Sequence, residues 1–344
     1  MRWVVGLGLV IAALPAMGGV SQRVIVIATP HDELAKASQV RWMEVGASGL
    51  RSLRTVSVPH AAGAALRGDV LPGSDAAVIA CDDDGAQDGE YGATLYRADS
   101  SGLRQLATGL VHASRPLASI DGQVYVERGA RDLQRVDALT IDAIDPSSGA
   151  AHTVLAWSGF ALHLAGELAG ELVLYRVGPA GADIVAIERS TGRVRAVSSM
   201  PPFARDFSID AGKGAVVFSN RDDVDAHLWV VERMDLASGA RTRLHQERDE
   251  SPAPFAMPSG DVAWTAPRRS GLFVLGKATA PLGAGFDSVR AVTSDGALAI
   301  IAHVPSSGWD TAAIVDFATA RTLPLPTDVR IEPVGFVGAR AVLR

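Results

Sequence analysis

A strand-turn-strand unit returns every 43 to 53 residues through most of this chain of 344 residues. Five hairpin turns mark the repeat, and their final glycines are separated by 53, 47, 43 and 47 residues: Gly49, Gly102, Gly149, Gly192 and Gly239. A segment rich in Arg, Thr, Leu and Val follows each of these glycines. A unit of this size cannot bury its apolar face alone, so neighbouring copies must stack against one another.

A second recurring element is a short apolar strand that follows a turn of Asp, Ser, Gly or Pro. It occurs seven times, at residues 76–80, 124–126, 172–175, 216–218, 262–264, 297–301 and 341–343. These segments combine β-branched or aromatic residues with Ala and Gly, which is typical of innermost strands crowded around a narrow axis. The sequence therefore predicts an all-β fold, a single β-propeller of about seven four-stranded blades. Counts of six and eight blades stay open.

The two ends of the chain complement each other in this pattern. No hairpin follows the seventh apolar segment, whereas residues 24–28, 40–45 and 50–58 form a hairpin set without a clear innermost strand. Pairing the two ends in one blade would remove the exposed sheet edges that favour aggregation. We therefore predict that N- and C-terminal strands close the ring within one domain, residues 20–344. A short helical stretch is indicated only at residues 31–38.

Residues 1–19 have the pattern of a secretory signal peptide. Met1-Arg2 precedes an unbroken apolar run at residues 3–14, and small residues suited to cleavage follow. The run is shorter than the roughly 20 residues that a membrane-spanning helix needs. We expect a periplasmic or secreted protein with no transmembrane anchor after cleavage. The single cysteine, Cys81, allows no internal disulfide and is expected to be a small buried hydrophobe.

Charge and motif content exclude several functions. The formal net charge is −6 without a long basic block, whereas nucleic-acid binding needs clustered positive charge. The chain has no Gly-x-Ser-x-Gly, His-Glu-x-x-His, paired-cysteine or phosphate-loop motif, and its eight histidines are scattered singly. We therefore predict a monomeric, non-catalytic scaffold that binds an unknown protein or small ligand through its loop face. The alternative is a propeller hydrolase or lyase with Asp, Glu and His at the channel mouth, with or without calcium.

These two functions predict different channels. Three or more His, Asp, Glu and Arg side chains that meet in an axial pocket would favour the enzyme. A dry channel lined by Ala would favour the binding scaffold.

Two stretches of the chain resemble a known repeat. Residues 216–223 read Val-Val-Phe-Ser-Asn-Arg-Asp-Asp, and Leu-Trp-Val-Val at residues 228–231 and an Asp-x-x-Ser-Gly turn follow. Residues 251–265 add a proline-containing lead-in to an apolar strand. This pattern resembles the blade of TolB-like periplasmic propellers. The resemblance implies a binding or scaffold protein, or the propeller half of a larger peptidase. We expect no counterpart of TolB's N-terminal domain in this sequence, so the resemblance does not imply TolB's role in a membrane complex.

Two polar clusters are candidate sites. The acidic segment at residues 81–90 offers Asp82, Asp84 and Asp88 as oxygen ligands for calcium. A solvated acidic turn is the alternative, because Ala80 stands where such loops carry their first Asp.

The second cluster lies at residues 220–227 and offers Arg221, Asp222, Asp223 and His227 as binding residues. A turn stabilised by an Arg-Asp ion pair is the alternative.

Two further expectations concern local structure. Arg67-Gly68-Asp69 is expected to begin a turn. Four tryptophans at repeat-related positions are expected to fill the space between blades: Trp42, Trp157, Trp229 and Trp264.

Overall fold

A computed structural model of the chain describes residues 22–46, 49–82, 92–112, 114–129, 136–201, 203–266, 269–274, 277–278, 285–305, 307–317, 319 and 321–338. Within these ranges the protein is all-β, as predicted, and contains no helix. It accordingly has, in the described part, no helix long and apolar enough to cross a membrane. The predicted signal peptide, residues 1–19, lies outside the described residues.

The 28 strands of the described residues are grouped in fours in chain order, and the last strand completes the first group. The first group is β1 (Gln22–Pro30), β2 (Ala37–Gly46) and β3 (Gly49–Pro59), completed by β28 (Val329–Phe336). The others are β4 (Leu66–Val70), β5 (Ala77–Asp82), β6 (Gly92–Asp99), β7 (Gly102–Val111); β8 (Leu117–Ala118), β9 (Val124–Arg128), β10 (Asp137–Ile144), β11 (Ala151–Gly159); β12 (Ala161–Leu168), β13 (Glu171–Gly178), β14 (Gly181–Glu188), β15 (Val194–Met200); β16 (Arg205–Asp210), β17 (Ala215–Arg221), β18 (Leu228–Asp235), β19 (Arg241–Arg248); β20 (Ala253–Ala256), β21 (Val262–Ala266), β22 (Arg269–Val274), β23 (Lys277–Ala278); and β24 (Gly285–Val292), β25 (Leu298–Pro305), β26 (Thr311–Asp316), β27 (Arg321–Pro324).

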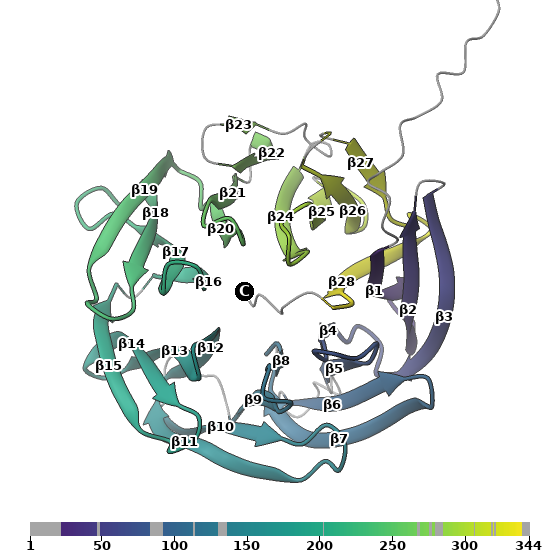
Figure 1. Cartoon of the computed structure of the whole chain (residues 1–344), viewed down its shortest axis with the longest axis horizontal. Coiled ribbons are helices and arrows are strands. Elements are labelled where there is room, and N and C mark those ends of the chain that lie inside the picture. The colour runs from purple at the N-terminus through teal and green to yellow at the C-terminus, as the bar shows by residue number, and fades with distance from the viewer. Residues whose placement is uncertain are drawn as a thin grey trace, which may run out of the picture.

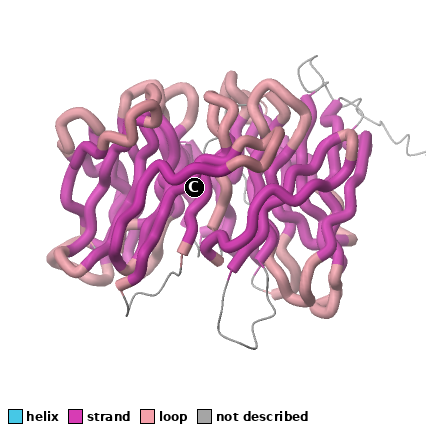
Figure 2. The backbone as a smooth tube through the Cα atoms, turned by 90° about the horizontal axis from the view of Figure 1, so that it is seen from below, coloured by secondary structure: helices cyan, strands magenta, loops and turns pink. Residues whose placement is uncertain are grey.

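The strands form antiparallel sheets arranged around one axis, which is the architecture of a β-propeller (Figure 1). Figure 2 shows that the strands run between two faces of the ring, with loops on both faces. Hydrogen bonding within the described residues gives six sheets, not seven: five have four strands and one has eight. The eight-stranded sheet arises because Leu110 of β7 is paired with Arg128 of β9.

The strands nearest the axis are not the predicted ones. Figure 1 shows β4, β8, β12, β16, β20, β24 and β28 around the axis. Six of the seven apolar segments predicted there are instead the second strands β5, β9, β13, β17, β21 and β25. A second strand packs against neighbouring sheets on both faces, so it carries the continuous apolar run. All six residues of β5 are buried, for example. The innermost strands border the channel and therefore carry more polar residues.

The two ends of the chain close the ring in one sheet, as predicted. Strand β28 pairs antiparallel with β1, and Val24 lies opposite Phe336. The closing strand is Val329–Phe336, whereas the predicted segment, residues 341–343, lies outside the described residues. The sequence pattern hid this strand because Pro333 interrupts it, and proline is rare within a ladder. In the structure Pro333 lies opposite Val26, where the register shifts.

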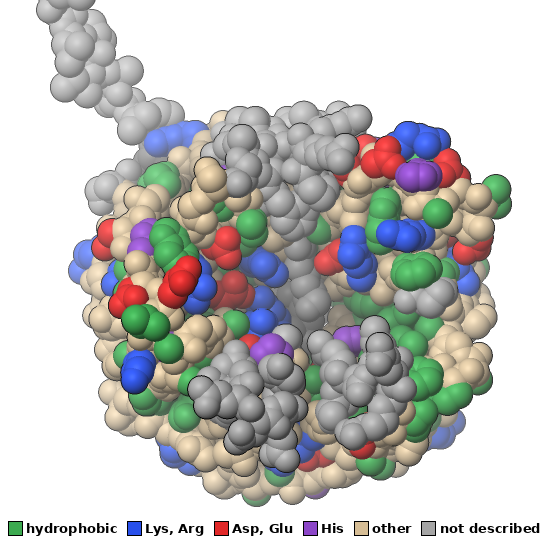
Figure 3. Space-filling view, turned by 180° about the vertical axis from the view of Figure 1, so that it is seen from behind, with side chains coloured by type: hydrophobic (Ala, Val, Ile, Leu, Met, Phe, Trp, Pro, Cys, Tyr) green, Lys and Arg blue, Asp and Glu red, His purple; other side chains and the backbone are tan. Residues whose placement is uncertain are grey.

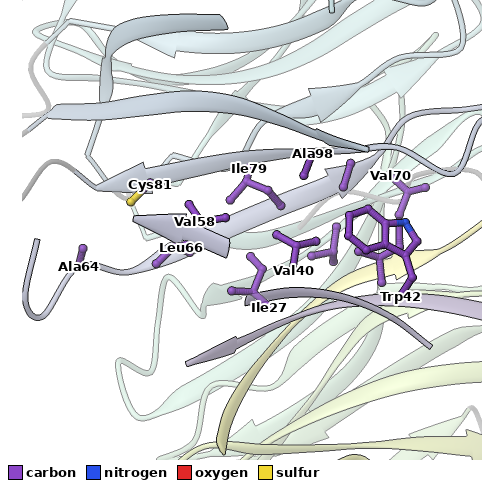
Figure 4. Close-up of a cluster of buried hydrophobic side chains, with 13 residues drawn as sticks. Ile27, Val40, Trp42, Val58, Ala64, Leu66, Val70, Ile79, Cys81 and Ala98 are labelled. Atoms are coloured by element: carbon purple, nitrogen blue, oxygen red, sulfur yellow. The ribbon is translucent and has the colours of Figure 1, made fainter. Parts of the chain in front are cut away.

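Seven hydrophobic clusters occupy the described interior, and each lies between two consecutive groups of strands. Figure 4 shows the cluster between the first two groups, which contains Trp42, Val70 and Ile79. Cys81 belongs to the same cluster, which confirms that it is a small buried hydrophobe. Trp264 fills the corresponding space between two later sheets.

Two local predictions were wrong. Arg67, Gly68 and Asp69 lie within strand β4 rather than at a turn. A side chain at position 68 would come within 2.7 Å of Val78 O, so this strand can approach its neighbour only with glycine. Residues 31–36 form turns that lead directly into β2, not a helix, because the β1–β2 pairing already begins at Gln39.

Candidate functional site

A cavity of about 340 Å³ lies at the axis, lined by residues from the inner strands β4, β12, β16 and β24 and their neighbours. Figure 3 shows basic, acidic and histidine side chains around the hollow at the centre of one face. Four arginines line the cavity, together with two acidic residues and one histidine: Arg67, Arg115, Arg205, Arg290, Glu127, Asp206 and His163. The channel therefore has the charged lining expected of the enzyme rather than a dry wall of Ala.

Three of the four arginines have partners in the wall. Arg67 donates from Nη1 to Asp82 Oδ2 at 3.0 Å, and Arg115 donates from Nη2 to Glu332 Oε1 at 2.5 Å. Arg205 donates from Nε to a serine hydroxyl at 2.9 Å, and its guanidinium lies 4.2 Å from the ring centroid of Trp229. These contacts hold the guanidinium groups in fixed positions around the cavity.

The fourth arginine, Arg290, is different because its Nε is buried without a hydrogen-bond partner among the described residues. Burial lowers the pKa of its guanidinium; Glu332 nearby opposes this effect, and Arg115 adds to it. The hydroxyl of Ser114, which lines the same cavity, is also buried and unpartnered in the described part of the chain. Buried polar atoms without partners cost free energy, so both atoms would gain from a polar group in the cavity.

Asp206 contributes a strained backbone to the cavity wall. It has a φ of +55°, a left-handed conformation that is unfavourable for a residue with a Cβ. The register between β16 and β17 shifts between Arg205 and Ser208, so Asp206 lies in a bulge. Its carboxylate lies 3.8 Å from Nε of Arg205. Bulges next to functional sites often redirect a side chain in this way.

Polar side chains link the inner wall from one sheet to the next. Asp69 accepts hydrogen bonds from the backbone N–H groups of Val70 at 2.8 Å and Ala118 at 2.9 Å. Glu127 accepts one from the N–H of Leu164 at 2.7 Å. Burial raises the pKa of Asp69 to about 7, although both backbone bonds and the nearby Arg115 oppose this shift. Glu127 and Asp69 thus help to hold the cavity wall.

The structure places the predicted binding cluster at the turn between β17 and β18, outside the cavity lining. Asp222 accepts hydrogen bonds from the N–H of Val224 at 2.9 Å and from Nη2 of Arg243 at 2.7 Å. This is the turn with an Arg-Asp ion pair that the sequence left as the alternative. Asp223 is exposed in the same turn.

The remaining two members of that cluster contact other loops. Arg221 lies over the rings of Phe203 and Trp229, at 5.1 and 5.2 Å from their centroids. His227 Nδ1 lies 2.8 Å from Asp249 Oδ1. Arg205, which lines the cavity, also lies over the ring of Trp229. The ring of Trp229 therefore contacts both the cluster, through Arg221, and the cavity lining, through Arg205. A binding role for the cluster stays a prediction.

Of the predicted calcium ligands, only Asp82 lies in the described residues; Asp84 and Asp88 lie outside them. Asp82 ends β5 and is buried. Its Oδ2 lies 3.0 Å from Nη1 of Arg67 and 3.4 Å from Nε2 of His112. A calcium ion would have to compete with these groups for the carboxylate.

We expect calcium to leave the thermal midpoint of unfolding unchanged relative to a chelator, because Arg67 already neutralises Asp82. A site filled to 100 times its Kd would stabilise the fold by about 2.7 kcal/mol, which a melting curve detects easily. The measurement is a thermal melt at millimolar calcium beside one with chelator. A rise in midpoint that Asp84→Asn abolishes would show that the loop binds calcium.

Sequence reasoning did not find the cavity. Its charged residues are scattered between positions 67 and 290, and no two of the four arginines lie on the same strand. The one available signal was a charged residue within a strand that also holds apolar residues, as at Arg290 in β24. That signal is too common to select a site.

Comparison with known proteins identifies the fold alone. No family model matches the chain, and no curated protein sequence does. Among solved structures, TolB from Acinetobacter baumannii superposes with a TM-score of 0.53 at 12% identity, covering 92% of this chain and 66% of TolB. The fold is that of the TolB-like β-propellers. The predicted resemblance is thereby confirmed at the level of fold.

Two peptidases contain a similar propeller. A prolyl endopeptidase matches with a TM-score of 0.57 at 12% identity, covering 90% of this chain and 50% of the peptidase. Prolyl oligopeptidase B from Galerina marginata matches with a TM-score of 0.56 at 13% identity, covering 91% and 51%. The chain spans about two thirds of TolB and half of each peptidase. At such low identity, nothing about activity follows from the likeness.

Proposed function

We propose that this TolB-like propeller is an exported, non-catalytic scaffold that binds a small polar ligand in its axial cavity. The observation that carries the proposal is one cavity lined by four arginines and by Ser114, of which Arg290 and Ser114 each have a buried polar atom without a partner among the described residues. A cavity of about 340 Å³ lies within the range of small-molecule sites. A ligand that bonds to these residues would satisfy polar groups that the described protein atoms leave unpartnered.

The polar groups of the cavity are arranged for holding rather than for reaction. A nucleophilic serine needs a base within hydrogen-bond reach, and the hydroxyl of Ser114 has no such partner in the described residues. The ring of His163 is stacked on Tyr175, with centroids 6.1 Å apart. Glu127 is engaged by a backbone N–H. These contacts support a binding role.

The proposal is tested by filling the cavity. His163→Trp should narrow it, since a larger ring can keep the stack on Tyr175, and Val194→Trp is the control because Val194 is 41% exposed on the outer strand β15. In a thermal-shift screen of small polar compounds, we expect hits with the wild type and with Val194→Trp that disappear with His163→Trp. Hits that survive in His163→Trp would place binding elsewhere, and a partner that binds the loop cluster at Arg221 would then be favoured.

A hydrolase or lyase is the second candidate, and the charged lining of the cavity favours it. Glu127, His163 and Asp206 are groups that general acid-base catalysis uses. The two functions differ in the fate of the bound compound. We expect each screening hit to be recovered unchanged after prolonged incubation with the protein. Recovery of a cleaved product, lost in His163→Trp, would instead show an enzyme.

We also infer that the ring has seven blades and that the mature protein is a periplasmic or secreted monomer. The seven hydrophobic clusters, each between two consecutive groups of strands, support the count, since a closed ring has as many interfaces as blades. The single bridge between Leu110 and Arg128 then joins two blades into the eight-stranded sheet. The signal-like pattern at residues 1–19 supports export.

A further inference from the structure

We propose that the axial cavity selects a small anion that carries carboxylate or phosphate groups, with Arg290 as its principal contact. This inference rests on the proposed function and names the chemical class of the ligand. It depends on the donors that line the cavity, their origin in the fold and the room between them.

Donors exceed acceptors in the lining. A guanidinium offers five N–H donors and no acceptor. The side-chain hydrogen bonds described above use one donor each from Arg67, Arg115 and Arg205. Nε of Arg290 is buried and unpartnered among the described residues. A ligand rich in acceptors fits this surface, and anionic oxygens form the strongest bonds to guanidinium.

The acidic side chains near the cavity do not accept a hydrogen bond from Nε of Arg290. Glu332 is bonded by Arg115 at 2.5 Å, and Glu127 accepts the N–H of Leu164 at 2.7 Å. Asp206 lies 3.8 Å from Nε of Arg205 and accepts a hydroxyl from Ser219 at 3.4 Å. Each carboxylate has a nearer partner. Glu332, Asp206 and Asp310 act on Arg290 only through the electrostatic field, so an incoming anion would add a direct acceptor for its guanidinium.

The four arginines come from different parts of the ring. Arg67 lies on β4, Arg115 precedes β8, Arg205 begins β16 and Arg290 lies on β24. An anion between them would be held from several sides by rigid strands. Preorganised donors of this kind cost little entropy on binding, which favours a multiply charged ligand over a neutral one. A cation would face the guanidinium groups and be repelled.

The cavity volume limits the ligand to a small molecule. A space of about 340 Å³ is at the lower end of the range for small-molecule sites. Citrate and inorganic phosphate are suitable probes, because one carries carboxylates and the other phosphate oxygens. Sucrose is a neutral probe rich in hydroxyl groups, and spermidine is a cationic one.

The experiment is calorimetric titration of the full mature chain with these four probes at low ionic strength. We expect citrate, phosphate or both to bind, and sucrose and spermidine not to bind. Added sodium chloride should weaken binding, because it screens the attraction between charges. The citrate and phosphate arms distinguish the two sources of anionic oxygen.

Variants assign the binding to the cavity. Arg290→Gln should weaken anion binding at least tenfold, since it removes a charge-assisted contact. Arg51→Gln is the matched control: it removes the same charge from a side chain that is 71% exposed on β3. Arg205→Gln is the test variant if Arg290→Gln does not fold, because the side chain of Arg205 lines the cavity and is 52% exposed.

Two results would overturn the inference, and they separate it from the proposed function. Binding of sucrose as tight as that of the anions, with Arg290→Gln and Arg205→Gln unchanged, would leave a ligand-binding cavity but refute its anion selectivity. A second result is that no anion binds, although the compound screen still gives hits that His163→Trp abolishes. This result would also leave a ligand-binding cavity but refute its anion selectivity. A screen with no hit at all would remove the proposed function as well.

Discussion

Truncation of the chain after residue 328, which removes β28, should abolish cooperative folding. Strand β28 buries Val329, Ile331, Val334 and Phe336 and pairs with β1 along its whole length. Burial of such a side chain contributes about 1.5–3 kcal/mol, so the strand contributes about 6–12 kcal/mol. That is comparable with the entire stability of a typical domain. Circular dichroism and urea titration measure the loss.

A second truncation, after Gly338, is the matched control. It keeps β28 and the hydrogen bond from the N–H of Val337 to Arg23 O at 2.9 Å. We expect this shorter chain to unfold with the same urea midpoint as the full mature chain. Normal unfolding of the chain that ends at residue 328 would contradict closure of the ring by β28. Loss of folding in both truncations would assign closure to residues beyond 338.

The stability of the wild-type protein should fall as pH rises from about 4 to about 7, and Asp69→Asn should remove this dependence. Burial raises the pKa of Asp69 from 3.8 to about 7 in the folded state. Between these values the folded protein holds a proton that the unfolded chain has lost, so rising pH favours unfolding. One pKa unit corresponds to about 1.4 kcal/mol, which makes the full effect about 4 kcal/mol.

The measurement is the free energy of unfolding in urea at pH 5 and pH 8, for the wild type and for Asp69→Asn. Asp295→Asn is the control, because the hydroxyl of Thr293 and then the N–H of Ala297 lower the pKa of Asp295. That residue titrates below pH 4 in both states, so it adds no slope between pH 5 and pH 8. Parallel curves for wild type and Asp69→Asn would contradict the shifted pKa.

Asp69 also connects stability to the cavity. It bonds to the N–H of Ala118 in β8, and Arg115 lies a few residues before that strand. Weakening this link should loosen the wall that carries Arg115. For this reason the anion titrations belong at a single pH, with Arg51→Gln beside Arg290→Gln in the same buffer.

The sequence alone determined the fold class, the repeat and the closure of the ring. Turn glycines and apolar strands depend on local conformation and on burial, and both leave a periodic pattern along the chain. The sequence-based prediction assigned the wrong strands to the innermost position. It chose the most buried strand of each sheet, and this is the second strand, as β5 shows. Local pattern reports burial and cannot report distance from an axis.

Only the tertiary structure brought the candidate site together. Arg67, Arg115, Arg205 and Arg290 meet because the ring bends four distant segments towards one axis. No spacing in the sequence encodes that meeting, since the four arginines lie in separate segments of the chain. The pKa of Asp69 and the unpartnered Nε of Arg290 likewise depend on burial by residues far away in the chain. Local interactions thus determine where the strands lie in the sequence, and long-range packing determines which polar side chains meet in the cavity and how deeply they are buried.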